Sequence, residues 1–319
     1  MDVLKELYQI GIVPVIKIED VEDSVPLAQA LCDGGIPCAE VTFRTAHAAE
    51  AIRRMTEAFP DMLVGAGTVL TTEQVDRAWA AGAKFMVSPG LNPKVVAYCV
   101  EKNIPIVPGC SSPSNIEQAL ELGLDVVKFF PAEQVGGIAM IKAMAAPYTN
   151  VRFIPTGGIN ATNLNNYLSF PKVLACGGSW MVPGDALKAK DFAKIKSLAQ
   201  EAMEQMLGLE LAHVGINAAD ETDASATADS FCHLFGFLRK DGNSSVFAGS
   251  AVEVMKKPYL GTHGHIGFRT NYIERAVAYM EHKGIVFDYD TAKYGKDGKM
   301  TAIYLKDQIG GFAVHLVQK

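Results

Sequence analysis

The chain has 319 residues, of which 49% are hydrophobic and 20% are charged, and its formal net charge is -6. This balance excludes disordered and fibrous chains, and the length suits two domains. The interspersed charges offer no basic stripe for nucleic acid, no uncharged run is long enough to span a membrane, and the N-terminus shows no cleavable signal pattern. We therefore expect a cytoplasmic protein without nucleic-acid or membrane partners.

The six cysteines are scattered and lack the close pairs that are typical of zinc sites and redox motifs. Most of them lie in apolar surroundings, which favours buried free thiols. They are Cys32, Cys38, Cys99, Cys110, Cys176 and Cys232.

Up to about residue 207, short β-rich apolar runs alternate with longer helical patterns, which is typical of βα units and a parallel sheet. Eight runs are present: Ile12 to Lys17, Cys38 to Phe43, Leu63 to Gly65, Phe85 to Val87, Ile104 to Val107, Val126 to Phe129, Val151 to Ile154 and Val173 to Ala175. The helical patterns between them include Asp23 to Asp33, Ala46 to Phe59, Thr72 to Ala81, Lys94 to Lys102 and Ile116 to Leu122. Eight strand-helix units in this length predict a (β/α)8 TIM barrel.

A last helical pattern, Lys188 to Met206, ends before Gly208, and a different pattern follows. We place the domains at residues 1–207 and 211–319. The second domain has the predicted strands His213 to Asn217, Ser245 to Ala248, Val252 to Met255, His265 to Arg269, Phe287 to Tyr294, Met300 to Lys306 and Phe312 to Val317, with helices at Ala224 to Phe235 and Tyr272 to Lys283. The motif His213-Val214-Gly215-Ile216 is echoed by His265-Ile266-Gly267-Phe268, which indicates two βαβββ modules in one α+β domain.

Lys128 lies near the end of the sixth predicted strand, among apolar residues. Removing an amine from water favours its neutral form, and a neutral amine attacks ketones to form a Schiff base. The alternative is a structural lysine whose stem is buried and whose ammonium group reaches the barrel rim.

On the second predicted strand, Glu40, Thr42 and Arg44 alternate and therefore share one face. Polar residues on the inner face near the C-terminal end of a barrel strand indicate an active site, because that end carries catalysis in TIM barrels. A carboxylate there can move protons, and a guanidinium can bind the carboxylate of a 2-keto acid. A structural glutamate-arginine pair is the alternative.

The seventh and eighth strands lead into Thr156-Gly157-Gly158 and Gly177-Gly178-Ser179. Loops at these two places commonly bind phosphate in this fold, because small residues let backbone amides approach the anion. Glycine also serves ordinary turns, so the prediction depends on both loops occurring together.

The chain to about residue 207 resembles the 2-keto-3-deoxy-6-phosphogluconate (KDPG) and 4-hydroxy-2-oxoglutarate (KHG) aldolases. The matching stretches are Glu40-Val41-Thr42-Phe43-Arg44-Thr45, Gly65-Ala66-Gly67-Thr68-Val69, Val87-Ser88-Pro89-Gly90, Lys128-Phe129-Phe130-Pro131-Ala132-Glu133, Pro155-Thr156-Gly157-Gly158-Ile159 and Gly177-Gly178-Ser179-Trp180. The resemblance implies a class I aldolase that needs no metal and cleaves KDPG to pyruvate and glyceraldehyde 3-phosphate. KHG, which shares the pyruvyl head, is the alternative substrate.

The resemblance also implies roles for single residues. Lys128 would form the Schiff base, and Glu40 would act as general acid and base. The other implied contacts are Arg44 and Thr68 with the pyruvyl portion, Phe130 packed against it, Pro89 and Thr156 lining the pocket, and Gly157, Gly158, Gly178 and Ser179 with phosphate. A homotrimer is implied as well. Phe43 stands where relatives often carry Leu, and it should point away from the chemistry.

Residues from about Leu211 to Lys319 resemble glyoxalase-like, vicinal-oxygen-chelate domains, on the doubled βαβββ pattern. The resemblance implies a divalent metal, such as Zn, Fe, Mn or Ni, held by His213, Glu253, His265 and His315. His315 stands where relatives often have Glu, which puts a glyoxalase-like reaction in doubt. Alternatively, these are ordinary strand residues of a metal-free interaction or sensor module.

Two readings of the whole chain compete with the aldolase. One is another phosphate-binding barrel enzyme, an isomerase or epimerase, which would share the glycine loops but would not need Lys128 in an apolar strand. The other is a binding protein in which the C-terminal domain senses a ligand. Lys128, Glu40, Arg44 and Thr68 together favour the aldolase.

Overall fold

The structure is a computed structural model that describes residues 2–319. The chain folds into two compact units, Met1–Gln205 (unit 1) and Met206–Lys319 (unit 2). Across the described residues, no helix has both the length and the apolar character that crossing a lipid bilayer requires.

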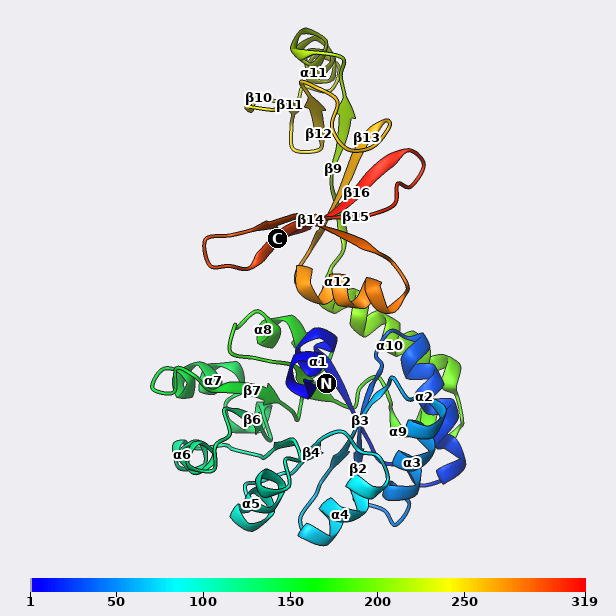
Figure 1. Cartoon of the computed structure of the whole chain (residues 1–319), viewed down its shortest axis with the longest axis vertical. Helices are drawn as coiled ribbons and strands as arrows, with labels where there is room; N and C mark the ends of the chain where they lie inside the picture. Colours follow the sequence, from blue (N-terminus) through cyan, green and yellow to red (C-terminus); the bar gives the residue numbers. More distant parts are fainter. Residues whose placement is uncertain (1) are drawn as a thin grey trace. The chain divides into compact units, whose positions relative to one another are not determined.

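Unit 1 is a ring of eight parallel strands with helices on its outside (Figure 1). Its strands are β1 (Ile12–Ile16), β2 (Cys38–Thr42), β3 (Leu63–Gly67), β4 (Met86–Val87), β5 (Ile106–Val107), β6 (Val126–Phe129), β7 (Arg152–Pro155) and β8 (Cys176–Gly178). One sheet runs β5-β4-β3-β2-β1-β8 and a second pairs β6 with β7. Bridges from Gly109 to Lys128 and from Phe153 to Val173 join the two sheets and close the ring. The predicted TIM-barrel-like α/β fold is confirmed.

The outer layer of unit 1 is helical. Its helices are α1 (Val3–Ile10), η1 (Val21–Asp23), α2 (Ser24–Asp33), α3 (Ala48–Ala58), α4 (Thr72–Ala80), α5 (Pro93–Glu101), α6 (Pro113–Glu121), η2 (Glu133–Val135), α7 (Gly137–Ala145), α8 (Leu164–Leu168), α9 (Gly184–Lys188) and α10 (Phe192–Leu207). Helix α6 begins three residues before the predicted start. Ser112 caps it by accepting a hydrogen bond from the backbone N–H of Asn115 at 3.3 Å, and Pro113 fits the first turn.

Two further predictions for unit 1 were wrong in detail. The eighth strand lies at Cys176–Gly178, three residues after the predicted run, because its glycines have poor strand preference and its pairing with β1 sets its position. The predicted helix from Lys188 to Met206 is α10, which begins only at Phe192, because the chain turns at Lys190, whose φ is 54°. Helix α1 has no counterpart in the sequence prediction.

Unit 2 repeats the order strand, helix, three strands. Its elements are β9 (Glu210–Asn217), α11 (Glu221–Phe235), β10 (Arg239–Asp241), β11 (Ser245–Ala248) and β12 (Val252–Met255), then β13 (Gly264–Thr270), α12 (Ile273–His282), β14 (Phe287–Tyr294), β15 (Met300–Leu305) and β16 (Phe312–Gln318). They form one mixed sheet in the order β10-β11-β12-β9-β13-β16-β15-β14. The antiparallel pair β9 and β13 joins the two halves. Only β10 was missed, because its three residues are charged and exposed.

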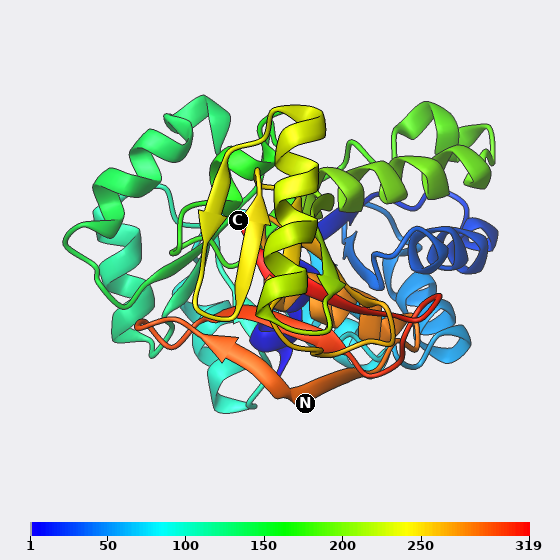
Figure 2. The same ribbon diagram turned by 90° about the horizontal axis from the view of Figure 1, so that it is seen from above.

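Helix α11 covers one face of the first half of this sheet, as Figure 2 shows by the yellow-green helix beside the yellow strands. Ala224 and Ala228 of the helix pack on Val246 and Val254 of β11 and β12. Because side chains alternate along a strand, Glu253 points to the opposite face. Helix α11 therefore does not cover the face of the sheet on which Glu253 lies.

The six cysteines are free thiols, and Cys38, Cys99, Cys110 and Cys176 are buried. Cys32 and Cys232 are only partly buried, so the expected burial holds for four of the six thiols. Burial raises the pKa of Cys110 to about 12 and that of Cys32 to about 11, so both are protonated at neutral pH.

Gly65 in β3 is a position where the barrel interior allows no side chain. A Cβ there would lie 2.4 Å from the Phe85 ring, so we expect Gly65→Ala to destabilise unit 1 by about 1 to 3 kcal/mol through overpacking. Both tryptophans of the chain, Trp79 and Trp180, lie in unit 1, so urea unfolding followed by tryptophan fluorescence reports on this unit.

The matched control is Gly184→Ala, because no atom lies within 4 Å of a Cβ at that position. We expect its unfolding midpoint to stay at or above that of the unchanged protein. Equal midpoints for the two variants would contradict the packing argument.

Candidate active site and candidate metal centre

The barrel of unit 1 encloses an ion pair between Lys128 on β6 and Glu40 on β2. The Lys128 Nζ donates to Glu40 Oε1 at 3.1 Å and lies 3.5 Å from Oε2. Lys128 is 6% exposed and Glu40 is 3% exposed, although 88 residues separate them in the chain. A buried pair of this kind holds a nucleophile and a proton acceptor within hydrogen-bonding distance.

Apolar side chains surround this pair. A void of only about 10 Å³ lies beside it, lined by Leu7, Val13, Glu40, Phe85, Val87, Val107, Lys128 and Ile154. Gly67 of β3 leaves room for the carboxylate, because a Cβ there would lie 2.2 Å from Glu40 Oε1. The sequence motif contained Gly67, but its spatial role was not recognised, since the approach of Glu40 depends on the pairing of β2 with β3.

Arg44 lies just beyond β2 and is exposed. Its Nε donates to Thr42 Oγ1 at 3.2 Å.

Thr68 follows β3 and has a φ of 55°, a backbone conformation that non-glycine residues seldom adopt and that is enriched at functional sites. Phe43 points away from Glu40 and Thr42 and lies under the guanidinium of Arg77 in α4, 5.8 Å from ring centroid to Cζ.

The segment after β6 packs against the loop after β7. The backbone N–H of Glu133 donates to the Gly157 carbonyl at 3.1 Å, and a Cβ on Gly157 would lie 3.4 Å from the Phe130 ring. The Phe130 ring centroid is in turn 5.5 Å from Lys128 Nζ. These contacts bring Phe130 and Gly157 to the end of the barrel where the Lys128 strand ends.

The remaining predicted residues of unit 1 lie at the C-terminal ends of strands. Pro89 follows β4, and its carbonyl lies against Gly109, the residue that bridges Lys128. Gly158 has a φ of 80° and is exposed, as is Ser179 after β8. Thr156 is buried, and its Oγ1 has no hydrogen-bond partner among residues 2–319. None of the four donates to or accepts from Lys128 or Glu40 within the described chain.

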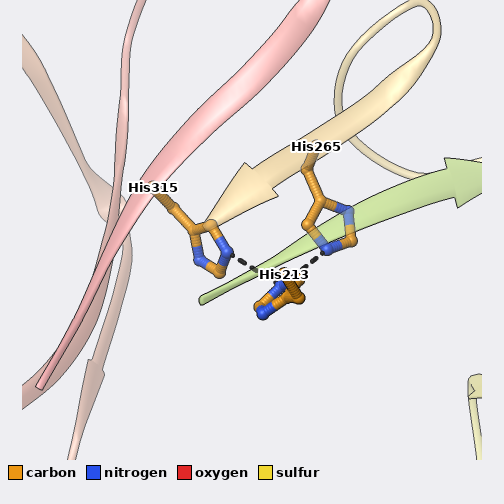
Figure 3. A group of neighbouring side chains, drawn as sticks. All are labelled: His213, His265 and His315. Atoms are coloured by element: carbon orange, nitrogen blue, oxygen red, sulfur yellow. Dashed lines mark hydrogen bonds between the residues drawn. The ribbon is translucent and has the colours of Figure 1, made fainter. Parts of the chain in front are cut away.

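Unit 2 gathers four polar side chains on the face of the sheet away from α11. The Nε2 atoms of His265 and His315 lie 3.1 and 3.2 Å from His213 Nε2, as Figure 3 shows. Glu253 Oε2 lies 3.2 Å from His265 Nε2 and 3.4 Å from His213 Nε2. The structure therefore brings the three predicted histidine ligands together, with one ring nitrogen of each within 4.8 Å of the others. The predicted carboxylate ligand, Glu253, contacts two of them, His213 and His265.

Two glycines make room for the imidazoles. Gly215 on β9 pairs with His265 on β13, and Gly267 on β13 pairs with His213 on β9. A Cβ on Gly215 would lie 2.1 Å from the His265 ring, and a Cβ on Gly267 would lie 2.5 Å from His315 Nε2. The repeated His-x-Gly motif thus places each histidine over the glycine of the other strand. Sequence reasoning found this repeat but missed what its glycines do.

Burial and the neighbouring groups together shift the pKa values in this cluster. Burial lowers the pKa of His213, and burial together with the neighbouring His213 and His265 lowers the pKa of His315 to about 3. For Glu253, burial acts to raise the pKa, but hydrogen bonds from His265 and from Ser245 Oγ, at 2.6 Å, outweigh it and hold the pKa below its usual value. His213 and His315 are therefore neutral and Glu253 is ionised near pH 7, the states in which these groups bind metal ions.

Two residues around this cluster were not predicted. Ser245 holds Glu253, and the Tyr304 ring stacks on His315 with the ring centroids 4.5 Å apart. Strand pairing places Tyr304 directly opposite His315. Neither residue carries a sequence signal, because serine and tyrosine are common in strands and only their register gives them these neighbours.

Comparison with known proteins identifies the barrel. The family profile described as "Aldolase: KDPG and KHG aldolase" matches residues 3–198. The 2-dehydro-3-deoxy-phosphogluconate aldolase of Treponema pallidum is 55% identical over 202 residues, which cover 63% of this chain and 96% of that protein. The KHG/KDPG aldolase of Escherichia coli K12 is 46% identical over 193 residues, which cover 60% of this chain and 91% of that protein.

Solved structures agree. The KDPG aldolase of Legionella pneumophila, with pyruvate captured as a covalent carbinolamine intermediate, has a TM-score of 0.62 and 40% identity over 63% of this chain and 98% of its own. The aldolase of Zymomonas mobilis with 3-phosphoglycerate has a TM-score of 0.59 and 44% identity, and the match covers 62% of this chain and 94% of that one. The resemblance found in the motifs is confirmed, and this chain belongs to the KDPG and KHG aldolase family.

Proposed function

We propose that this protein is a class I aldolase that cleaves 2-dehydro-3-deoxy-6-phosphogluconate to pyruvate and glyceraldehyde 3-phosphate. The observation that carries the proposal is the buried pair of Lys128 and Glu40, 3.1 Å apart in an apolar barrel interior. Relatives at 46% to 55% identity carry the name of this activity. KHG, which would yield pyruvate and glyoxylate, is a second candidate substrate, because the E. coli relative is named for both.

In the first half of the reaction, Glu40 accepts a proton from the Lys128 ammonium group, which frees the amine to attack the C2 ketone. Glu40 then returns a proton to the C2 hydroxyl, which leaves as water and gives the iminium. The cationic iminium is the electron sink, so this class of aldolase needs no metal ion.

In the second half, Glu40 accepts the proton of the C4 hydroxyl, through a water molecule, while the bond between C3 and C4 breaks. The bonding electrons move into the iminium and leave an enamine, and glyceraldehyde 3-phosphate departs. Glu40 then protonates C3, and water hydrolyses the resulting pyruvyl iminium to free Lys128.

The other site residues supply binding. Arg44 and Thr68 would bind the pyruvyl carboxylate and carbonyl region, and Phe130 would pack on its methylene group, which the position of Phe130 beside Lys128 supports. Pro89 and Thr156 would line the pocket. Gly157, Gly158, Gly178 and Ser179 would bind the phosphate with backbone amides and a hydroxyl group, which the exposure of Gly158 after β7 and of Ser179 after β8 supports. Gly178 is the buried last residue of β8.

The competing hypothesis of an isomerase or epimerase explains the glycine loops but does not explain a buried lysine at position 128. A homotrimer, a cytoplasmic location and a division into an aldolase domain of residues 1–207 and a second domain of residues 211–319 stay predictions. Sedimentation analysis of the purified protein would test the trimer.

Replacing Lys128 tests the aldolase directly. Because only its amine can form the imine, we expect Lys128→Ala to reduce cleavage of the phosphorylated substrate by at least about 10³-fold. Incubation with pyruvate and borohydride, followed by peptide mapping, should place a reduced adduct on Lys128 of the unchanged protein and none in the variant.

Lys142→Ala is the matched control, since Lys142 lies on the outer helix α7 and should leave both turnover and adduct intact. Cleavage at an undiminished rate by Lys128→Ala would refute the mechanism. An adduct at another lysine would show that this other lysine is the nucleophile.

We also propose that residues 211–319 form a glyoxalase-like domain with a divalent metal centre. The doubled strand-helix-strand-strand-strand order supports it, as does the cluster of His213, His265 and His315, with Glu253 in contact with the first two. Two donors that each lie about 2.1 Å from a tetrahedral ion are roughly 3.4 Å apart, and the contacts of 3.1 to 3.4 Å between these donors fit that spacing.

Three imidazoles and one carboxylate suit Zn²⁺ or another borderline divalent ion such as Fe²⁺, Mn²⁺ or Ni²⁺. When bound, such an ion would act as a Lewis acid toward an oxygen-bearing ligand. Ser245 would hold Glu253 in place by its hydrogen bond to Oε1. His315 in a position where glyoxalase-like relatives often carry Glu argues against assigning a glyoxalase reaction.

The metal centre predicts the effect of two substitutions. We expect His213→Ala, which removes a ligand, and Gly267→Ala, which fills the space of His213 and His315, to weaken metal binding by at least about 10- to 100-fold. Metal content after dialysis against a metal-supplemented buffer measures this.

His233→Ala is the control, because His233 is exposed on α11 and lies outside the cluster. It should retain one ion per chain. If the unchanged full-length protein holds less than stoichiometric metal with each of the four ions, the metal centre is wrong.

A further inference from the structure

Arg44 is already held by one protein group before any substrate binds. Its Nε–H donates to Thr42 Oγ1 at 3.2 Å, and within residues 2–319 no protein atom hydrogen-bonds to Nη1 or Nη2. A guanidinium has five N–H groups, so four remain available on the two terminal nitrogens. Arg44 is exposed, which leaves these four free to meet a ligand.

Thr42 is oriented by a second hydrogen bond. Its Oγ1–H donates to the Ile16 carbonyl at the end of β1, at 2.8 Å, and the side chain is 1% exposed. A hydroxyl has a single proton, so once Ile16 has received it, the oxygen can only accept from Arg44. The donor in each hydrogen bond is therefore fixed: Arg44 donates to Thr42, and Thr42 donates to Ile16.

We propose that Thr42 is a positioning residue that orients Arg44 so that its two terminal nitrogens bind the substrate carboxylate end-on. An arginine can grip a carboxylate through Nε and one Nη, or through both Nη atoms. With Nε occupied by Thr42, only the second geometry remains. This inference rests on the proposed role of Arg44 in binding the 2-keto acid, and it adds the residue and the geometry that make the binding possible.

The chain provides a matched control in Thr45. Its Oγ1 donates to the carbonyl of Ile18, two residues beyond the end of β1, at 2.7 Å. Thr45 makes no hydrogen bond to Arg44 within the described residues. Replacing either threonine by valine keeps its shape and removes one hydrogen bond to the segment from Ile16 to Ile18, but only the change at Thr42 also frees the guanidinium.

The experiment compares Thr42→Val, Thr42→Ser and Thr45→Val in the full-length protein. We expect Thr42→Val to raise KM for the phosphorylated substrate by roughly 10-fold or more, with a smaller change in kcat, because a hydrogen bond to a charged group is lost. The pyruvate concentration that gives half-maximal borohydride trapping on Lys128 should rise in parallel. Thr42→Ser should restore both values, and Thr45→Val should leave both within about twofold of the unchanged protein.

Arg44→Ala separates this inference from the proposed function. If Arg44→Ala leaves KM unchanged, the carboxylate-binding role of Arg44 is wrong. If Arg44→Ala raises KM but Thr42→Val behaves like Thr45→Val, Thr42 does not position Arg44. A double variant, Arg44→Ala with Thr42→Val, should bind substrate no worse than Arg44→Ala alone, and additive effects would overturn the coupling.

Folding is checked by the urea midpoint of tryptophan fluorescence, which reports on unit 1. If Thr42→Val fails to fold, Thr42→Ala and Thr42→Ser are compared instead. The same raised KM in alanine and normal KM in serine are then expected. An equal KM in alanine and serine would refute the proposal.

Discussion

The active end of the barrel depends on keeping two opposite charges out of water and next to each other. Lys128 and Glu40 lie on strands far apart in sequence, and each is almost fully buried. Neither charge would be tolerated there alone, because an unpaired charge in an apolar interior costs several kcal/mol. The closed ring of strands makes the pair possible, since it brings β6 and β2 to face each other across one interior. The apolar lining then keeps water away from the pair on the sides that it covers.

Glycines lie beside the polar side chains of both clusters. Gly67 leaves space for the Glu40 carboxylate in unit 1, and Gly215 and Gly267 leave space for three imidazoles in unit 2. The two units share no fold, yet each builds its polar cluster by the same device: a strand glycine beside a large polar side chain on a neighbouring strand. Local flexibility is not what these glycines provide. They provide room, and an added methyl group would displace the functional side chain itself.

Much of this architecture was visible in the sequence. The alternation of apolar runs and helical patterns predicted the α/β barrel, and the predicted bounds of β6, β11, β12 and β14 coincide with the observed ones. Errors fell where local signals are weak. The eighth strand ends in glycines, which have poor strand preference, and it exists because its neighbours β1 and β7 close the ring. Strand β10 is charged and exposed, so it has no apolar pattern to detect.

Motifs and periodicity are local properties of the chain, so they sufficed to predict the aldolase family, the kinds of residues at the site and the doubled pattern of unit 2. Which of these residues come into contact depends on the folded sheets. Residues of different strands are joined by the 3.1 Å contact of Lys128 with Glu40, by the contacts among the three histidines and Glu253, and by the hydrogen bonds that link Ile16 through Thr42 to Arg44. Strand register sets these contacts, and register is fixed by the packing of the whole sheet rather than by any single segment.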